Sequence, residues 1–431
     1  MCGIFGIINF NKKSVDRAEI EEMSNHMFFR GPDDKGVFIS KNIGIGMRRL
    51  SIIDPQGQCQ PISDKENKIY LVLNGEIYNY LELRHELIEK GYSFKTNGDV
   101  EVLLHLYREM GLSCINKING MFSFALVDLE KKITWIARDR VGIKPLFYYE
   151  DKNKLLFSSD LLALNKITKQ DINKRSLLEY LGLSYIKDPH TMFKNIKKLK
   201  AGNQIIINNN KVIINSYWSL NLENIIKGNI QTAIKKTEEL IRESVKIQLR
   251  SDVPVGILLS GGTDSAAIAK FSRDTLGKKQ IESFTADFVC KSSEDTFYSK
   301  IISDKFNFRS NILKLSKENY LKTIDEIMPY LDEPLADSAL IANYYLSKKA
   351  KERGIKVLLS GAGGDEIFGG YSRHFVKNLF SAQWFAHYKI PRFIIRIFSK
   401  MINKDHFYRF QSDSMNYASM ISGVNYYFLK K

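Results

Sequence analysis

The chain has few cysteines, no long apolar run and no leader-like start. Four cysteines occur among 431 residues and none forms a Cys-x-x-Cys pair, so we expect neither a disulfide framework nor a zinc site, and a reducing, cytoplasmic setting fits. No run of about 18 apolar residues occurs, so we expect no membrane span. No charged segment followed by an apolar stretch opens the chain, so we expect no signal peptide. The cysteines are Cys2, Cys59, Cys114 and Cys290.

Acidic residues are fewer than basic ones. Lysine and arginine number 64 against 48 Asp and Glu, which gives a formal charge of +16 and a pI of about 9.3. A polyanion such as nucleic acid or a membrane surface would suit this charge. No recognisable nucleic-acid-binding module accompanies it, however, so we favour a lysine-rich solvated surface and expect no nucleic-acid partner. A substrate that carries phosphates would also favour a locally positive site.

The first half of the chain has the pattern of a β-rich domain. Hydrophobic content of 44% and charged content of 26% are typical of soluble globular proteins, and the length predicts two domains. Short apolar runs between turn residues predict strands, Asn209-Asn210 predicts a hairpin turn, and apolar residues at helical spacing predict a helix. The strands are Ile43–Met47, Ile69–Leu73, Phe122–Asp128, Ile133–Ala137, Leu155–Ser158, Gln204–Asn208 and Lys211–Asn215; the helical face is Val100, Leu103, Leu104 and Tyr107.

The pattern changes after Trp218. A helical stripe comes first, and apolar runs then alternate with helical segments, which indicates a parallel α/β sheet. We place the boundary near residue 215, so that the domains are 1–215 and 216–431. The stripe is Ile234, Ile241, Val245 and Leu249, and the runs are Val255–Leu259, Ser283–Phe288 and Lys356–Leu359.

Cys2 is a candidate nucleophile. Removal of Met1 would leave Cys2 with a free α-amino group, whose pKa of about 7.7–8.0 leaves part of it neutral, and so available as a base, at cellular pH. Such an amine can take the proton of the neighbouring nucleophile. Taken alone, however, Cys2 fits a buried structural cysteine better.

Several residues elsewhere in the sequence favour a catalytic role for Cys2 over a structural one. Arg49 could pair with a carboxylate in a bidentate manner. Asn74 and the backbone N–H of Gly75 are donors of the kind that form an oxyanion hole. Glu76 could bind an ammonium group, and Asp99 could do so too or cap a helix. Each of these residues also has an ordinary structural explanation as a turn, a cap or a surface pair.

Six motifs in order resemble the glutaminase domain of glutamine-dependent asparagine synthetases, which are N-terminal-nucleophile amidotransferases. The resemblance spans residues 1 to about 215 and implies an αββα sandwich. It implies Cys2 as nucleophile, Asn74 and Gly75 as oxyanion hole, and Arg49, Asn74, Glu76 and Asp99 as glutamine-binding residues. Phe29 and Asp160 depart from the family pattern without touching this chemistry. The motifs are Cys2-Gly3-Ile4, Arg30–Asp34, Arg49-Leu50-Ser51, Asn74–Asn79, Gly98–Glu101 and Arg138–Leu146.

A glycine- and hydroxyl-rich loop follows the apolar run Val255–Leu259. Its small residues free backbone N–H groups to surround an anion, and the helix predicted after it adds a favourable dipole. No Gly-Lys-[Ser/Thr] follows, so it is not a Walker loop. It resembles the pyrophosphate-binding loop of ATP pyrophosphatases. We expect an ATP site made of Leu258, Ser260, Gly261, Gly262, Thr263, Asp264, Ser265, Ser360 and Gly361.

A second loop, Ser360–Tyr371, resembles the other nucleotide-site motif of the synthetase domain. Asp264 and Asp365 are then the expected Mg²⁺ ligands, because this ion prefers one or two carboxylates plus phosphate oxygens. The segment Leu331–Ser338 also matches the family, although a surface turn explains it about as well. By resemblance, aspartate attacks ATP to give an acyl-adenylate, and ammonia then displaces AMP.

Ala362 and the C-terminal segment weaken the match to the synthetase domain. Ala362 stands where asparagine synthetases often carry a carboxylate. Residues 372–431 are rich in aromatic and basic residues, and their basic helix Ile390–Ile402 could lie at a membrane interface or await a covering partner. We expect the synthetase domain to be incomplete and its product yield low. Alternatives are another acceptor carboxylate such as a sugar acid, and a glutaminase or regulatory module with a non-productive ATP site. A homodimer is one option.

Overall fold

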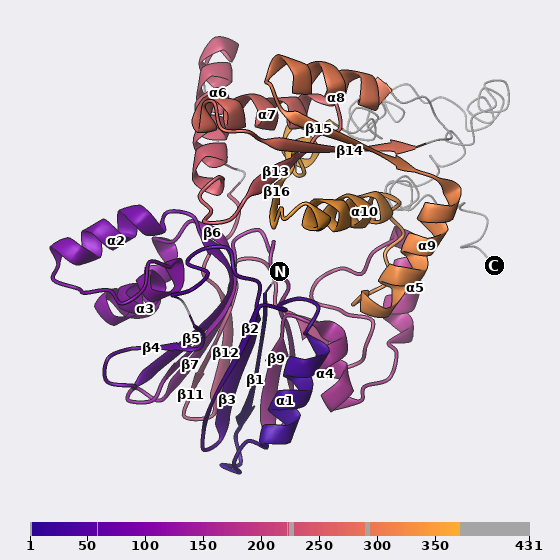
Figure 1. Cartoon of the computed structure of the whole chain (residues 1–431). Helices are drawn as coiled ribbons and strands as arrows, with labels where there is room; N and C mark the ends of the chain where they lie inside the picture. The colour runs from indigo at the N-terminus through magenta and orange to yellow at the C-terminus, as the bar shows by residue number, and fades with distance from the viewer. Residues whose placement is uncertain (1, 58, 222, 224–227, 289–293, 371–431) are drawn as a thin grey trace, which may run out of the picture. The chain divides into compact units, whose positions relative to one another are not determined.

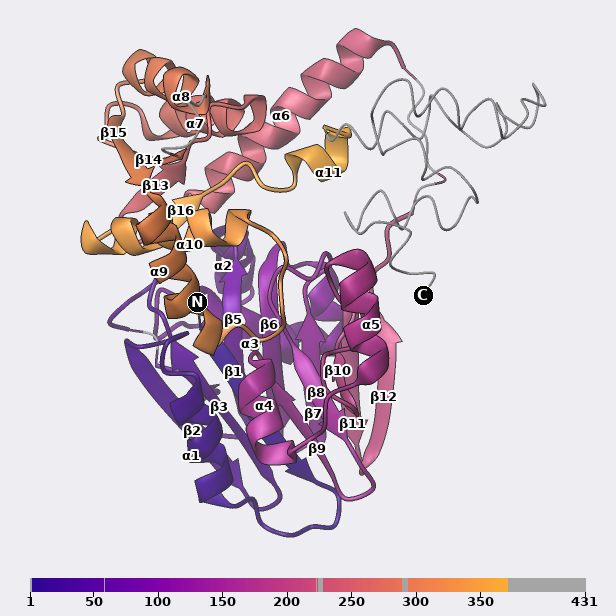
Figure 2. The same ribbon diagram turned by 90° about the vertical axis from the view of Figure 1, so that its right-hand side faces the viewer.

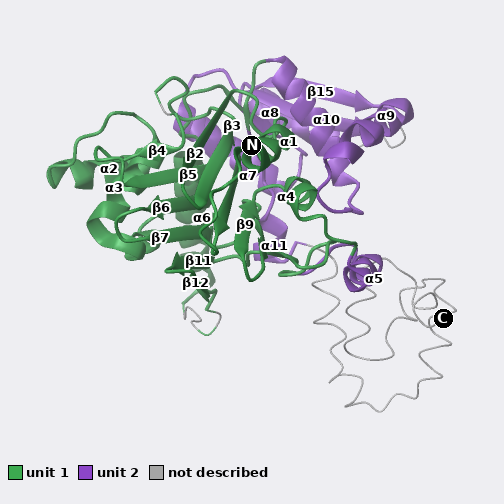
Figure 3. Cartoon of the chain, turned by 90° about the horizontal axis from the view of Figure 1, so that it is seen from below, with its two compact units in different colours: residues 1–172, 188–255, 354–357 green, residues 173–187, 256–353, 358–431 purple. Residues whose placement is uncertain are grey.

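The computed structural model describes residues 2–57, 59–221, 223, 228–288 and 294–370. The chain forms two compact units, coloured separately in Figure 3. The first unit comprises Met1–Ile172, Asp188–Val255 and Gly354–Val357, and the second comprises Asn173–Lys187, Gly256–Arg353 and Leu358–Lys431.

Two six-stranded sheets form the body of the first unit, with antiparallel pairing between their neighbouring strands (Figure 1). The first sheet has the order β10 (Ile196–Lys198), β8 (Phe147–Glu150), β9 (Lys154–Ser158), β1 (Gly3–Asn9), β3 (Ile43–Arg49) and β2 (Asp34–Ser40). The second has the order β12 (Lys211–Ser216), β11 (Asn203–Asn208), β7 (Ile133–Arg138), β6 (Gly120–Asp128), β5 (Ile69–Ile77) and β4 (Ile62–Ser63).

Helices cover the outer face of each sheet. The helices α1 (Arg17–His26) and α4 (Leu161–Thr168) pack on the first sheet. The helices α2 (Tyr80–Glu89) and α3 (Asp99–Met110) pack on the second, and the 3₁₀ helix η1 (Gly111–Asn116) follows α3. A third apolar cluster fills the space between the sheets. The four layers, visible in Figures 1 and 2, confirm the αββα sandwich.

Strand β1 shows why a chain in the middle of such a sandwich is continuously apolar. Ile4 and Ile8 face the layer between the sheets, whereas Phe5 and Ile7 face the helices α1 and α4. Both faces of the strand are covered, so the usual alternation of apolar and polar residues disappears. Gly6 lacks room for a side chain, because a Cβ there would lie 2.4 Å from the ring of Phe157.

The predicted strands and the hairpin of this unit are confirmed. Asn209 and Asn210 have φ values of 48° and 64° and join β11 to β12 with Asn208 opposite Lys211. Two positive φ values define the type I′ turn that suits the twist of a two-residue hairpin. The predicted helical stripe after Trp218 lies on α6 (Ile230–Gln248), where Val245 is buried and Ile234 is exposed.

The second unit contains a four-stranded sheet in the order β15 (Arg309–Leu315), β14 (Glu282–Phe288), β13 (Val255–Leu258) and β16 (Val357–Leu359). The β13–β14 and β14–β15 pairs are parallel, as predicted. The helices α7 (Thr263–Leu276) and α8 (Glu294–Lys305) lie on one face and α10 (Ala339–Glu352) on the other (Figures 1 and 2). The remaining helices are α5 (Lys174–Leu183), α9 (Lys317–Ile327), η2 (Met328–Tyr330) and α11 (Gly364–Phe368).

The sequence did not reveal β15, which is an edge strand whose residues are mostly exposed or half-buried. The expectations for residues 372–431, including a helix over Ile390–Ile402, lie outside the described residues. Within the described part of the chain, none of the helices combines the length and apolar character needed to cross a bilayer.

Candidate active sites

The six residues predicted to act on glutamine line one small cavity of the first unit, about 50 Å³ in volume. Cys2 precedes β1, Arg49 ends β3, Asn74, Gly75 and Glu76 lie near the end of β5, and Asp99 opens α3. The alternation of side chains along β5 explains why Asn74 and Glu76 lie together. Val72 packs in the layer between the sheets, and the side chains two and four positions later, Asn74 and Glu76, lie on the same face of the strand. Cys2 packs against that same layer.

The thiol of Cys2 is held at the edge of the cavity. Its Sγ lies 3.3 Å from the backbone N of Leu50, which donates to it, and 3.5 Å from the carbonyl oxygen of Leu50. Burial raises the pKa of the Cys2 thiol, whereas the Leu50 N–H and the nearby cations of Lys144 and Arg49 oppose that rise. The Cys2 thiol therefore holds its proton more tightly than an exposed cysteine does.

Arg49 presents a buried positive charge to the cavity. Its guanidinium donates to the carbonyl oxygens of Ile53 (2.9 Å), Asp54 (2.8 Å) and Pro55 (3.3 Å). The side chain is buried, and among the described residues no carboxylate forms an ion pair with it. Carbonyl groups fix the orientation of the guanidinium without neutralising it, so an anionic ligand would complete the site.

Glu76 supplies the opposite charge. Burial and the neighbouring carboxylate of Asp99 raise the pKa of Glu76 to about 7, although Lys144 opposes this. Within the described ranges, the side-chain carboxylate of Glu76 forms no hydrogen bond or ion pair. Asp99 accepts a hydrogen bond from the backbone N–H of Ile77 at 2.9 Å, which holds it beside Glu76. Two carboxylates close together in a buried place are suited to bind an ammonium group.

Asn74 and Gly75 lie where oxyanion donors are expected. Asn74 is 1% exposed, and its side-chain amide lies 3.2 Å from the hydroxyl of Ser159. Gly75 has a φ of 148°, and a Cβ there would lie 2.0 Å from the carbonyl oxygen of Met121. Only glycine fits this position, so the backbone of β5 can approach a ligand at this point without an intervening side chain.

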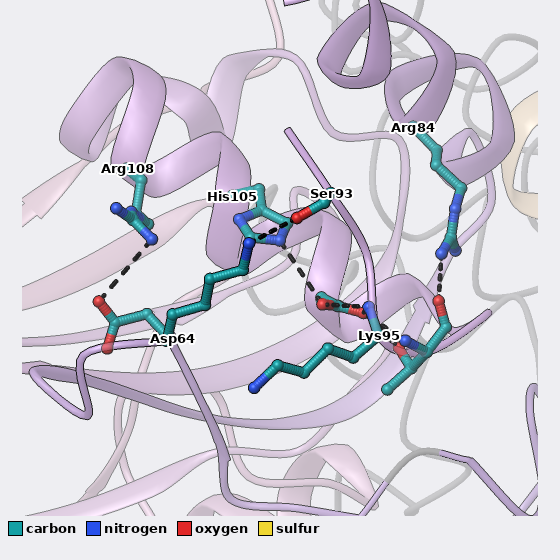
Figure 4. Close-up of polar contacts among 9 residues, drawn as sticks. Asp64, Arg84, Ser93, Lys95, His105 and Arg108 are labelled. Carbon is teal, nitrogen blue, oxygen red and sulfur yellow. Dashed lines mark hydrogen bonds and ion pairs between the residues drawn. The ribbon is translucent and has the colours of Figure 1, made fainter. Parts of the chain in front are cut away.

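The chain just before Asp99 is fixed by hydrogen bonds to Glu101. The carboxylate of Glu101 accepts from the backbone N–H groups of Lys95 (2.9 Å) and Thr96 (2.7 Å), and it lies 3.5 Å from Nε2 of His105. Arg84 also donates to the carbonyl oxygen of Thr96, and these contacts around Lys95, Arg84 and His105 are drawn in Figure 4. Burial opposes ionisation of Glu101, yet the hydrogen bonds lower its pKa to about 2.

We expect Glu101→Gln to lower the free energy of unfolding at pH 7 by about 1–3 kcal/mol, because a neutral amide cannot accept all of these hydrogen bonds. The KM for glutamine should rise, since the residues fixed by Glu101 lead directly into Asp99. The folded-state pKa of Glu101 is about 2, below its ordinary 4.5, so its stabilisation is present above pH 4.5 and is lost as the pH falls toward 2. Urea titrations at several pH values test this, with the exposed Glu109→Gln as control. An equal effect at pH 7 and at pH 2 would contradict it.

Two polar side chains of the cavity, Lys144 and Gln60, had no role assigned from the sequence. Lys144 belongs to the Arg138–Leu146 motif but is buried against Cys2 and Glu76, and burial lowers the pKa of its amine. Gln60 uses its side-chain oxygen to accept from the backbone N–H of Leu73 at 2.7 Å. Only the tertiary fold brings these side chains to the cavity.

The predicted ATP loop joins β13 to α7 in the second unit. Gly262 is the N-cap of α7, and in the described structure no side chain caps it, which leaves the first-turn N–H groups available to an anion. The hydroxyls of Ser260 and Ser265 lie 3.2 Å apart. Gly261 has a φ of 81°, and a Cβ there would lie 2.6 Å from the carbonyl oxygen of Asp295, so glycine is required.

The second loop packs directly against the first. A Cβ on Gly361 would lie 2.9 Å from that of Asp264, and a Cβ on Gly364 would lie 2.2 Å from a carboxylate oxygen of Asp264. Burial and the charges of Asp365 and Glu366 raise the pKa of Asp264. These carboxylates repel one another, so a divalent cation bound between them would relieve the repulsion.

This donor set suits Mg²⁺, which takes part of its coordination from phosphate oxygens and water. Among the residues that can be described, no group of three His, Cys, Asp or Glu side chains is placed to hold a metal by itself. Five residues of the segment Leu331–Ser338 line a cavity of about 330 Å³ together with residues of α9 and α10; they are Leu331, Leu335, Ala336, Asp337 and Ser338.

The comparisons define the chain as a glutamine amidotransferase domain followed by an asparagine synthase domain. Residues 1–218 match the family described as glutamine amidotransferase domain, and residues 236–420 match the family described as asparagine synthase. The chain belongs to the family of glutamine-hydrolysing asparagine synthetases, as the individual relatives show.

Three curated relatives illustrate this membership. A putative asparagine synthetase of Methanocaldococcus jannaschii is 36% identical over 94% of this chain and 82% of its own length. Asparagine synthetase 1 of Bacillus subtilis is 34% identical over 86% of this chain, and asparagine synthetase B of Escherichia coli is 30% identical over 86%. The chain spans 59% and 65% of the lengths of those two proteins. A solved PRPP amidotransferase from B. subtilis aligns at 13% identity with a TM-score of 0.40, which is too weak to carry an argument.

Proposed function

We propose that the chain uses glutamine as a nitrogen donor to convert aspartate into asparagine at the expense of ATP. The observation that carries the first half is the pair of opposite charges around Cys2. Arg49 and Glu76 have no ion-pair partner among the described residues, and both line the cavity of Cys2. The carboxylate and the ammonium of an amino acid match these two charges, and its side-chain amide then lies toward the thiol.

In this proposal the thiol of Cys2 attacks the amide carbon of glutamine. The α-amino group of Cys2 takes the thiol proton and passes it to the leaving nitrogen, so that ammonia departs and a γ-glutamyl thioester remains. Asn74 and the N–H of Gly75 stabilise the oxyanion, and water then hydrolyses the thioester to glutamate. Lys144 and Arg49 favour the thiolate, because both cations oppose the rise that burial causes in the pKa of Cys2.

The second half of the proposal concerns the loops of the second unit. The N-terminus of α7, with Ser260, Thr263 and Ser265, would bind the pyrophosphate part of ATP, and Leu258, Ser360 and Gly361 would complete the nucleotide site. Asp264 and Asp365 would hold Mg²⁺, which supplies positive charge to the phosphates as pyrophosphate leaves. Aspartate would form an acyl-adenylate, and ammonia would displace AMP. We place this enzyme in the cytoplasm.

Ala362 supports a second candidate for the carboxylate that receives the ammonia nitrogen. It is exposed in the loop after β16 and has no group that could deprotonate an attacking amine. A different carboxylate, such as a sugar acid, is therefore the alternative substrate. The test is to supply Mg·ATP with aspartate, or with a panel of other acids, and to measure pyrophosphate, AMP and the amide product. Asparagine formed from aspartate supports the proposal, turnover with another acid alone supports the alternative, and glutamine hydrolysis alone would leave only an amidotransferase.

The variants Asp264→Asn and Asp365→Asn should each reduce Mg·ATP-dependent pyrophosphate release on the order of 100-fold, because each removes a negative ligand from the cation. Glutamine hydrolysis should stay near the wild-type rate, since the cavity of Cys2 belongs to the other compact unit. Asp274→Asn is the matched control, because Asp274 pairs with Lys270 on α7 away from the loop. Unchanged pyrophosphate release in either variant would show that the metal assignment is wrong.

A further inference from the structure

Ser159 connects the strand of the nucleophile to Asn74. It follows β9 directly and is fully buried. Its backbone N–H donates to the carbonyl oxygen of Ile4 at 2.8 Å, and its hydroxyl oxygen accepts from the backbone N–H of Ile4 at 3.1 Å. The same hydroxyl lies 3.2 Å from the side-chain amide of Asn74, on the other sheet. Ser159 thus bridges β1, two residues after Cys2, and β5.

The hydrogen bonds of this bridge indicate which end of the Asn74 amide faces the hydroxyl. With Nδ2 toward Ser159, the hydroxyl receives two donors, its own O–H has no acceptor, and the buried Oδ1 of Asn74 has no partner among the described residues. A half-turn of the amide brings Oδ1 to the hydroxyl, which then donates to it while still accepting from Ile4. Since the two ends of an amide have nearly the same shape, the hydrogen-bond network decides between them.

The half-turn places Nδ2 where Oδ1 finds no hydrogen-bond donor among the described residues, on a buried side chain that lines the cavity of Cys2. We infer that Ser159 is a positioning residue: its O–H holds Oδ1 of Asn74, so that Nδ2 is directed to the oxyanion formed when Cys2 attacks glutamine. This rests on the proposed function. It adds a role for a residue that makes no contact with substrate and that no motif of the sequence singled out.

Two neighbouring serines provide controls. Ser123 lies opposite Asn74 on β6, is buried, and has a hydroxyl without a partner among the described residues. Ser158 is also buried, and its hydroxyl accepts from the backbone N–H of Asp160 at 2.9 Å. Among the described residues, neither hydroxyl forms a hydrogen bond with Asn74, so Ser123→Ala and Ser158→Ala report the effect of removing a buried hydroxyl nearby.

The test is the steady-state hydrolysis of glutamine by Ser159→Ala, Ser159→Thr, Asn74→Ala and the double variant. Ser159→Ala should lower kcat about tenfold or more with little change in KM, because Arg49, Glu76 and Asp99 still bind glutamine. Ser159→Thr keeps the hydroxyl and should recover part of the lost kcat. This variant tests the role of the hydroxyl even if Ser159→Ala folds poorly. In the Asn74→Ala background, removal of the Ser159 hydroxyl should have almost no further effect on kcat.

Losses that multiply in the double variant, or a Ser159→Ala variant that behaves like Ser123→Ala, would overturn the role of Ser159. A different result would contradict the proposed function. If Cys2→Ala retained glutamine hydrolysis, the assignment of the nucleophile itself would be wrong, whereas loss of hydrolysis in Cys2→Ala together with a normal Ser159→Ala would remove only the inference on Ser159.

Discussion

The Cys2→Ala variant is expected to lose glutamine hydrolysis on the order of 10⁴-fold or more, because no other described cysteine lines the cavity. Cys114 is buried in a separate cluster and Cys59 is exposed, and neither lines the cavity. The fold should survive, since the change removes only a sulfur atom at the edge of the cavity. Glutamate release is the measurement, and Cys59→Ala is the matched control, which should keep the wild-type rate.

The same variant separates the two half-reactions. When free ammonia replaces glutamine, any ATP-dependent amidation should persist in Cys2→Ala, because the nucleotide loops lie in the other compact unit and need no thiol. Glutamate release at the wild-type rate from Cys2→Ala would contradict the assignment. Loss of the ammonia-dependent reaction as well would show that Cys2 also supports the synthetase half.

Glu76→Gln is expected to stabilise the protein while it weakens glutamine binding. Burial and the charge of Asp99 raise the pKa of Glu76 to about 7, from an ordinary value of 4.5. Above pH 7 the folded protein therefore contains a buried carboxylate that is costly to ionise, and a neutral glutamine avoids this cost. The free energy of unfolding should rise at pH 8 by about 2–3 kcal/mol. The KM for glutamine should rise tenfold or more, on the order of the loss of one charged hydrogen bond.

The pH dependence distinguishes this explanation from a general effect of the substitution. A folded-state pKa above the unfolded one means that wild-type stability falls as the pH rises from 4.5 to 7, so the advantage of Glu76→Gln should disappear below pH 4.5. In the wild type, kcat/KM for glutamine should fall below pH 7, as Glu76 takes up a proton. Chemical denaturation and initial rates from pH 4 to pH 9 measure both effects, with the exposed Glu89→Gln as control. A stabilisation that is the same at all pH values would contradict the account.

Local patterns of the sequence were sufficient to predict most of the fold. The apolar runs that became β3, β5, β6, β7 and β9, and the two-asparagine turn before β12, carry their signal within a few residues. Strand β15 was missed because its residues are mostly exposed or half-buried at the edge of the sheet. The parallel sheet followed from the alternation of apolar runs and helical stripes.

The residues around Cys2 were also predicted only in part. Cys2, Arg49 and Glu76 were named from motifs, and the structure places them on one cavity. The positions of Lys144 and Ser159 could not be predicted, because their roles depend on contacts between residues far apart in the chain. Ser159 is 85 residues from Asn74 and 155 from Ile4, and no local periodicity connects these positions.

The most direct test of the central claim is to map the residue that reacts with a glutamine analogue. A diazoketone analogue has the carboxylate and ammonium that Arg49 and Glu76 are proposed to bind, and it alkylates the thiol placed at its side-chain carbon. After incubation, digestion and mass spectrometry, the label should lie on Cys2 at the start of a peptide that lacks Met1, and an excess of glutamine should prevent the labelling. A label on Cys59, Cys114 or Cys290, or labelling of Cys2 that glutamine does not prevent, would contradict the account.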